Sequence, residues 1–193
     1  MNFLFVRRRK ESPLDIRLLL EAALANAHQQ PDEGDGLSLI HRNRSKHFVE
    51  ALVAQFRQLY SDRPIVRVLS KHHKLYRNEF GLNELLFDVL VYDTSSVHSA
   101  RNAASLTFVT QGLWAVKSEF ARDTRQAIFD FNKLVLAVTK SKLFIGPIVA
   151  DEEDFLEPLL GSAARCGAEV LAALVTHPSD WPKSAPLPMS TSS

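Results

Sequence analysis

The chain is poor in the residues that build disulfide frameworks and thiolate metal clusters, and it has no long apolar run. Of its 193 residues only Cys166 is a cysteine, so neither a disulfide pair nor a thiolate cluster can form within it. Such cysteine usage is typical of a reducing compartment, and we expect a cytoplasmic protein. No apolar run approaches the roughly 20 residues of a membrane-spanning helix, so no membrane association is expected.

Signals for export and for serine-type catalysis are missing as well. At the start of the chain a very short apolar stretch precedes the cations of residues 7–10, which is the wrong order for a secretory signal. Ser, His and Asp are present, but no strand–turn–helix nucleophile elbow surrounds any serine. The sequence contains no internal repeat. These features favour an ordinary globular protein over a secreted, repetitive or hydrolase-fold one.

The net charge is also small, at +1, but the charged residues are unevenly distributed along the chain. Residues 1–77 hold 14 Lys and Arg against 8 Asp and Glu, a net of +6. The remaining residues hold 9 against 14, a net of −5. The basic front half predicts a phosphate-binding surface, and a solvated basic face is the alternative.

Hydrophobic periodicity divides the chain into helices and strands. Ser12 and Pro13 suit the cap and first position of the first helix. We predict helices over residues 14–28, 45–60, 123–140 and 154–166, strands over 64–69, 85–93, 113–120, 143–149 and 170–176, and a loop over 94–105. The expected organisation is an N-terminal helical extension and linker (1–40), an α/β domain (41–177) and a disordered tail (178–193).

Two of the predicted strands carry charges inside apolar runs. Asp88 lies in the run 85–93, and Lys117 and Glu119 lie in the run 113–120. Because side chains alternate along a strand, Lys117 and Glu119 point to the same side. Buried charge is costly unless it is paired or holds a metal ion. Acids on two strands of one sheet therefore predict a metal-dependent, nuclease-like site, and a structural ion pair is the alternative.

From about residue 45 to 149, the order of elements around these charges resembles the PD-(D/E)xK nuclease superfamily. That family has an Asp on the second core strand and an acidic-x-Lys pair on the third. The resemblance implies an α/β (α+β) fold, with a mixed central sheet and an αβββαβ restriction-endonuclease-like core, here preceded by an N-terminal helix. It also implies a candidate metal-dependent endonuclease, a hydrolase that binds DNA and uses Mg²⁺ or Mn²⁺ held by carboxylates.

Carried over by residue, the resemblance places Asp88 at the first acidic position. The third strand departs from the pattern, because Lys117 and Glu119 stand in inverted order. Against the Glu-x-Glu pattern of some relatives, Glu119 matches and Lys117 replaces the first acid. The implied catalytic residues are Asp88, Lys117, Glu119 and Lys133, and the implied metal ligands are Asp88, Glu119 and Glu50. A lysine at a ligand position would instead make the chain a degenerate, inactive relative.

Basic residues outside the motif are candidate contacts for a nucleic-acid backbone, with DNA the expected ligand. They are Arg42, Arg44, Lys46, Lys71, Lys74 and Arg77. The alternative function is a non-catalytic protein–protein interaction module, such as an assembly or immunity-type partner. In that case the helix over residues 14–28 is the contact surface, for another protein or for a second copy of the chain.

Overall fold

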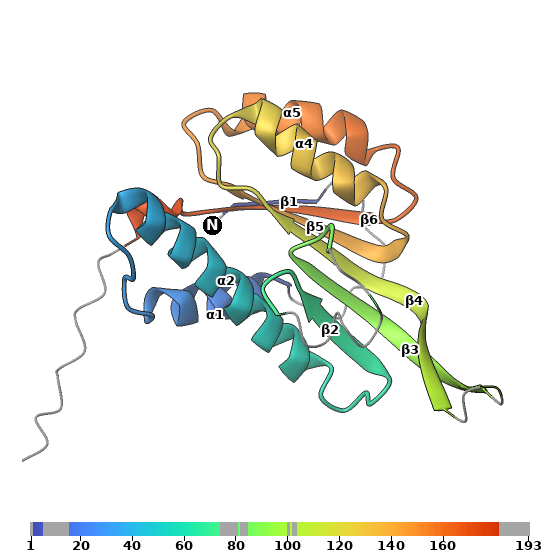
Figure 1. The fold of residues 1–193 in the computed structure, drawn as a ribbon. Coiled ribbons are helices and arrows are strands. Elements are labelled where there is room, and N and C mark those ends of the chain that lie inside the picture. The colour runs from blue at the N-terminus through green and yellow to red at the C-terminus, as the bar shows by residue number, and fades with distance from the viewer. Residues whose placement is uncertain are drawn as a thin grey trace, which may run out of the picture.

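The fold is mixed α/β, as predicted, and is built on one six-stranded sheet in the order β1-β6-β5-β4-β3-β2 (Figure 1). The computed structural model describes residues 2–5, 16–73, 81, 85–99, 101 and 104–181. Its strands are β1 (Asn2–Phe5), β2 (Val66–Ser70), β3 (Val89–Ser99), β4 (Ala104–Ser118), β5 (Thr139–Pro147) and β6 (Glu169–Val175).

Helices cover both faces of this sheet. They are α1 (Ile16–His28), α2 (Leu37–Leu59), α4 (Thr124–Val135) and α5 (Glu152–Ala163), with a short 3₁₀ helix, η1 (Pro178–Asp180). The helices α1 and α2 pack on one face, and α4 and α5 pack on the other (Figure 1). No helix among the described residues is long and apolar enough to cross a bilayer.

The sheet combines an antiparallel meander with two parallel crossovers. The strands β2, β3 and β4 pair antiparallel in succession, and β5 then pairs parallel to β4 after the crossover through α4. A second crossover through α5 places β6 parallel to β5, and β1 closes the sheet antiparallel to β6. From α2 to β5 the observed order is therefore helix, three strands, helix, strand.

Alternation along the strands decides which helix layer each side chain meets. Val89 and Val116 belong to the core beneath α1 and α2, whereas Ala115 belongs to the core beneath α4 and α5. Lys117 lies two residues beyond Ala115, so its side chain points toward α4, where it contacts Asp130.

The N-terminal segment belongs to the fold, which corrects its prediction as an extension. The strand β1 forms the sixth strand of the sheet, and the apolar stripe of α1 is buried. The predicted boundary at residue 40 falls inside α2, which begins at Leu37, eight residues before the predicted start. Leu37 and Leu39 are exposed, so this first part of the helix has no apolar stripe that the sequence could reveal.

The loop predicted over residues 94–105 is a two-stranded ribbon for most of its length. The strand β3 continues to Ser99 and β4 begins at Ala104, and together they extend beyond the rest of the sheet (Figure 1). We call residues 94–99 and 104–110 the β3–β4 arm. Serine and threonine dominate its β3 half and obscure its strand character in the sequence.

The beginning of the predicted disordered tail is also ordered. Trp181 is only 4% exposed, and its indole Nε1 donates to the carbonyl of Thr176 at 2.8 Å. Residues 182–193 lie outside the described residues. The helix α4 ends at Val135, before the predicted end at residue 140, because the chain from Thr139 pairs with β4.

Candidate functional site

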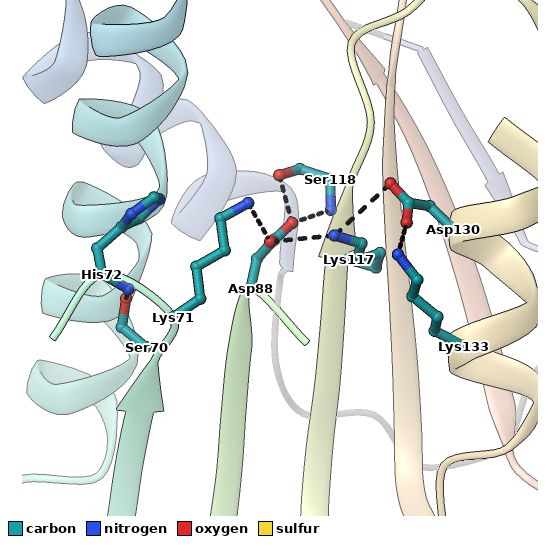
Figure 2. Close-up of polar contacts among 8 residues, drawn as sticks. All are labelled: Ser70, Lys71, His72, Asp88, Lys117, Ser118, Asp130 and Lys133. Atoms are coloured by element: carbon teal, nitrogen blue, oxygen red, sulfur yellow. Dashed lines mark hydrogen bonds and ion pairs between the residues drawn. The ribbon is translucent and has the colours of Figure 1, made fainter. Parts of the chain in front are cut away.

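Charged side chains from four segments meet at one end of the central strands (Figure 2). Lys71 follows the last residue of β2, Asp88 precedes β3, Lys117 lies near the end of β4, and Asp130 and Lys133 project from α4. Positive and negative groups alternate along this line. We call these five residues the charged row.

Asp88 is the fixed centre of the row. Its backbone N–H donates to the carbonyl of Val116 at 2.9 Å, and its carbonyl accepts from the N–H of Lys71 at 3.1 Å. Its side chain is fully buried. Oδ1 lies 2.6 Å from Lys71 Nζ and 3.3 Å from Lys117 Nζ. Oδ2 accepts from the N–H and the hydroxyl of Ser118 at 2.6 and 2.7 Å.

These contacts keep Asp88 ionised. Burial alone would raise its pKa, but the ammonium groups of Lys117 and Lys71 and the hydrogen bonds together lower the pKa below its usual value. Four donors already serve its two oxygens, so no oxygen faces an open coordination position. The carboxylate is saturated in this arrangement.

Lys117 links the two aspartates of the row. Its side chain is 9% exposed, and Nζ lies 3.3 Å from Asp88 Oδ1 and 3.6 Å from Asp130 Oδ2. Asp130 is held in turn by an ion pair with Lys133, one helical turn further along α4. The ammonium of Lys117 thus lies between the two carboxylates.

Glu119 joins the row through Asp130. Burial raises the pKa of Glu119, and a hydrogen bond to the Asp130 carboxylate raises it further. For Asp130, burial opposes ionisation, but the hydrogen bond from Glu119 and the nearby lysines lower its pKa. The pKa values of the two carboxyl groups therefore shift in opposite directions, and Glu119 keeps its proton to a higher pH than Asp130 does. Oε1 of Glu119 also accepts from the N–H of Ala121 at 2.7 Å.

The predicted metal ligands do not form a divalent site in this geometry. Glu50 lies on α2, across the sheet from α4, and its carboxylate contacts Lys46 and His47 at 3.8 and 3.7 Å. Among the residues that the structure describes, no three His, Cys, Asp or Glu side chains form a group that could hold a metal. With Asp88 saturated and Lys117 beside it, the residues do not fit a Mg²⁺ or Mn²⁺ ion.

The predicted nucleic-acid contacts separate into exposed and structural residues. Arg42 and Lys46 are exposed on α2, and Lys71 is exposed at one end of the row. Arg44 requires a correction, because its guanidinium is buried. It binds both oxygens of Asp32, at 2.6 and 2.8 Å, and the carbonyl of Pro178 at 2.6 Å. The hydrogen bond to Pro178 holds the segment after β6 against α2. Lys74 and Arg77 lie outside the described residues.

Asp130 is the member of the site that the sequence analysis missed. The buried residues of α4 are Ala127, Asp130, Phe131 and Leu134, so an acid stands on the apolar stripe of an amphipathic helix. An acid on an apolar stripe is the sequence signal that could have identified Asp130 as a site residue, because a buried carboxylate needs a partner. Ser118, between the two charged strand residues, was also missed as a donor to Asp88.

Comparison of the chain with protein-family models, with curated proteins and with solved structures gives no match.

Proposed function

We propose that this chain is a nuclease-like domain that binds nucleic acid without cleaving it, because the ammonium of Lys117 stands where an active relative would hold a metal ion. The observation that carries the proposal is the position of Lys117 Nζ, 3.3 and 3.6 Å from carboxylate oxygens of Asp88 and Asp130. Lys117 is the residue that inverts the family motif in the sequence.

The connectivity supports the family part of this proposal. The series α2, β2, β3, β4, α4, β5 has the order of a restriction-endonuclease-like core, with an antiparallel meander followed by a parallel strand. Asp88, which directly precedes the second strand of this series, lies beside Lys117 of the third strand. These are the strands on which the family places its acidic residues.

The absence of cleavage follows from the chemistry of the row. In a metal-dependent nuclease, carboxylates hold a divalent ion that activates water and stabilises charge on the phosphate. Here a buried lysine satisfies the same carboxylates. Its displacement would leave an uncompensated charge in a buried place, which costs several kcal/mol. Because the ammonium is covalently tethered to β4, a metal ion must overcome this cost in order to bind.

Retention of anion binding follows from the charge balance. The row holds three lysines and two aspartates, and the raised pKa of Glu119 keeps that neighbour protonated to higher pH than usual. The side chains of Lys71 and Lys133 are 38% and 37% exposed at the two ends of the row. Each could contact a phosphate while its partner aspartate stays buried.

One exposed cation of α2, Lys46, extends this surface at the Lys71 end. His72 follows Lys71, and its pKa is lowered, first by burial and then by nearby charges that include Lys71 and Lys46. Glu50, which pairs with Lys46 at 3.8 Å, has the opposite effect on the pKa of His72, so Lys46 and Glu50 of α2 both lie near the Lys71 end of the row. A phosphate backbone that contacts Lys71 would find the Lys46 ammonium in the same area.

Binding and cleavage of labelled single-stranded DNA, double-stranded DNA and RNA test the proposal. We expect salt-dependent binding by fluorescence anisotropy, and no nicking in Mg²⁺ or Mn²⁺. Lys71→Gln and Lys133→Gln should each weaken binding and reduce the salt slope by about one. Lys140→Gln is the matched control, because Lys140 is exposed at the other end of β5 and should leave binding unchanged.

Two results would contradict the proposal in different ways. Metal-dependent cleavage by the wild-type chain would mean that Lys117 does not block the site. A chain that binds none of the three nucleic acids, or that responds equally to Lys71→Gln and Lys140→Gln, would show that the row is not a nucleic-acid surface.

A further inference from the structure

The β3–β4 arm has backbone edges without a neighbouring strand among the described residues. The pairing of β4 with β5 begins at Gly112, so the β4 half of the arm pairs with β3 alone. The pairing of β3 with β2 extends from Val89 to Asp93, so the rest of β3 pairs with β4 alone. Open edges of this kind readily accept another strand.

One face of the arm is apolar. Val97 pairs with Leu106 across the ribbon, and Phe108 pairs with Ser95 on the same side. Val97, Leu106 and Phe108 are 52%, 48% and 46% exposed. The other face carries mainly hydroxyl groups and His98. The arm is therefore an amphipathic ribbon whose apolar side no described segment covers.

The arm also lacks the features that usually protect a strand edge. Protected edges carry lysine, proline or inward-pointing charges. No residue from 94 to 99 or from 104 to 116 is Lys, Arg, Asp, Glu or Pro. An uncharged edge is a poor nucleic-acid surface, but it can approach an identical edge without like-charge repulsion.

We propose that two copies of this chain associate through the arm, by antiparallel pairing of β4 with β4 about a two-fold axis near Leu106. A two-fold contact between identical strands is closed and self-complementary. An axis at this place keeps the intermolecular pairing within the arm, because β5 of the same chain occupies the edge from Gly112 onward. Leu106 of each copy then meets Leu106 of the second copy.

A hollow borders the base of the arm, where β5 takes up the edge of β4. It has a volume of about 840 Å³ and is lined by Val109 to Gly112 of β4, by Val138 to Lys140 and by Gly167 to Glu169. This inference is independent of the proposed nucleic-acid binding, since Lys117 lies at the opposite end of β4.

The oligomeric state of the full chain tests this inference. Analytical ultracentrifugation should show a dimer for the wild type and a monomer for Leu106→Glu, because two carboxylates would face each other across the axis. Leu18→Glu is the matched control, since Leu18 is 63% exposed on α1, and this variant should remain a dimer. Circular dichroism checks that both variants are folded.

A cysteine variant locates the axis directly. The one native thiol, Cys166, is buried, so Leu106→Cys adds the only accessible thiol. Under mild oxidation it should form a disulfide-linked dimer, whereas Leu18→Cys should not. A chain that is monomeric at every concentration, a dimer that persists in Leu106→Glu, or the absence of cross-linking in Leu106→Cys would overturn the inference.

Discussion

Lys117 is the buried lysine of the charged row, and it contacts both aspartates of the row. It approaches Asp88 and Asp130 together, and Asp88 in turn depends on Lys71 and Ser118. In a network of this kind, removal of one charged partner leaves the other charges buried without compensation. Such a removal lowers the free energy of unfolding by about 3–5 kcal/mol. The row is thus coupled more tightly than an exposed ion pair, which contributes about 0–1 kcal/mol.

The two kinds of carboxyl group in the site predict opposite responses of stability to pH. Asp88 has a lowered pKa, so its contribution is present above the ordinary value of 3.8 and is lost as the pH falls through the folded-state pKa. Glu119 has a raised pKa, so its contribution is present below the ordinary value of 4.5 and is lost as the pH rises through the folded-state pKa.

Urea unfolding across pH would measure both effects. Asp88→Asn should flatten the loss of unfolding free energy in acid. Glu119→Gln keeps a donor for Asp130 and should instead remove the decline on the alkaline side of pH 4.5. Asp123→Asn is a useful control, because Asp123 is an exposed helix cap outside the row. Identical pH profiles for Asp88→Asn and Glu119→Gln would contradict these assignments.

Part of this site could be predicted from the sequence. Charges within apolar strand segments identified Asp88, Lys117 and Glu119, because alternation along a strand places such side chains on a known face. Asp130 could not be placed beside them, since the contact depends on how α4 crosses the sheet. The same limit applies to Arg44, which looked like a surface cation until its partners, Asp32 and the carbonyl of Pro178, were known.

At the scale of elements, α1 and α2 form one layer over the sheet. The stripe of Ile16, Leu19, Leu20, Ala23 and Ala27 is buried in the same core as Phe48, Leu52 and Phe56 of α2. The helix expected over residues 14–28 therefore packs most of its apolar stripe against the core of the same chain. With this face buried, α1 offers little apolar surface for a partner beyond Leu18.

Two leucines of α1 provide a matched test of this packing. Leu20 is fully buried and Leu18 is 63% exposed. Leu20→Ala should lower the free energy of unfolding by about 2–5 kcal/mol, through lost burial and the cavity left behind. Leu18→Ala should change it by about 0.5 kcal/mol or less. Equal effects in chemical denaturation would show that α1 does not pack as described.

The order and type of the core elements could be predicted from hydrophobic periodicity, but several of their ends could not. Residues 94–99 alternate weakly, so only their pairing with residues 104–109 reveals the extension of β3. The strand β1 is too short to stand out, and it depends on its antiparallel pairing with β6. Long-range pairing of this kind leaves little local trace in a sequence.

For the whole molecule, the two proposals use opposite ends of β4. The charged row adjoins the end at Ser118, and the arm contains the start at Ala104. Pairing through the arm would leave both rows of a dimer away from the contact. One nucleic acid could then meet two rows, and the second binding event would become intramolecular. We therefore expect mutations in the arm to remove self-association without removing nucleic-acid binding, and mutations in the row to have the opposite effect.

Calorimetric titration of Lys117→Glu with Mg²⁺ and Mn²⁺ tests the position of Lys117 most directly. The substitution puts a third carboxylate beside Asp88 and Asp130, so the variant should bind either ion measurably and should gain thermal stability from it. The wild type and the exposed control Lys140→Glu should show no comparable binding. Tight binding and cleavage by the wild type, both lost in Lys117→Glu, would contradict the account and make Lys117 the catalytic lysine.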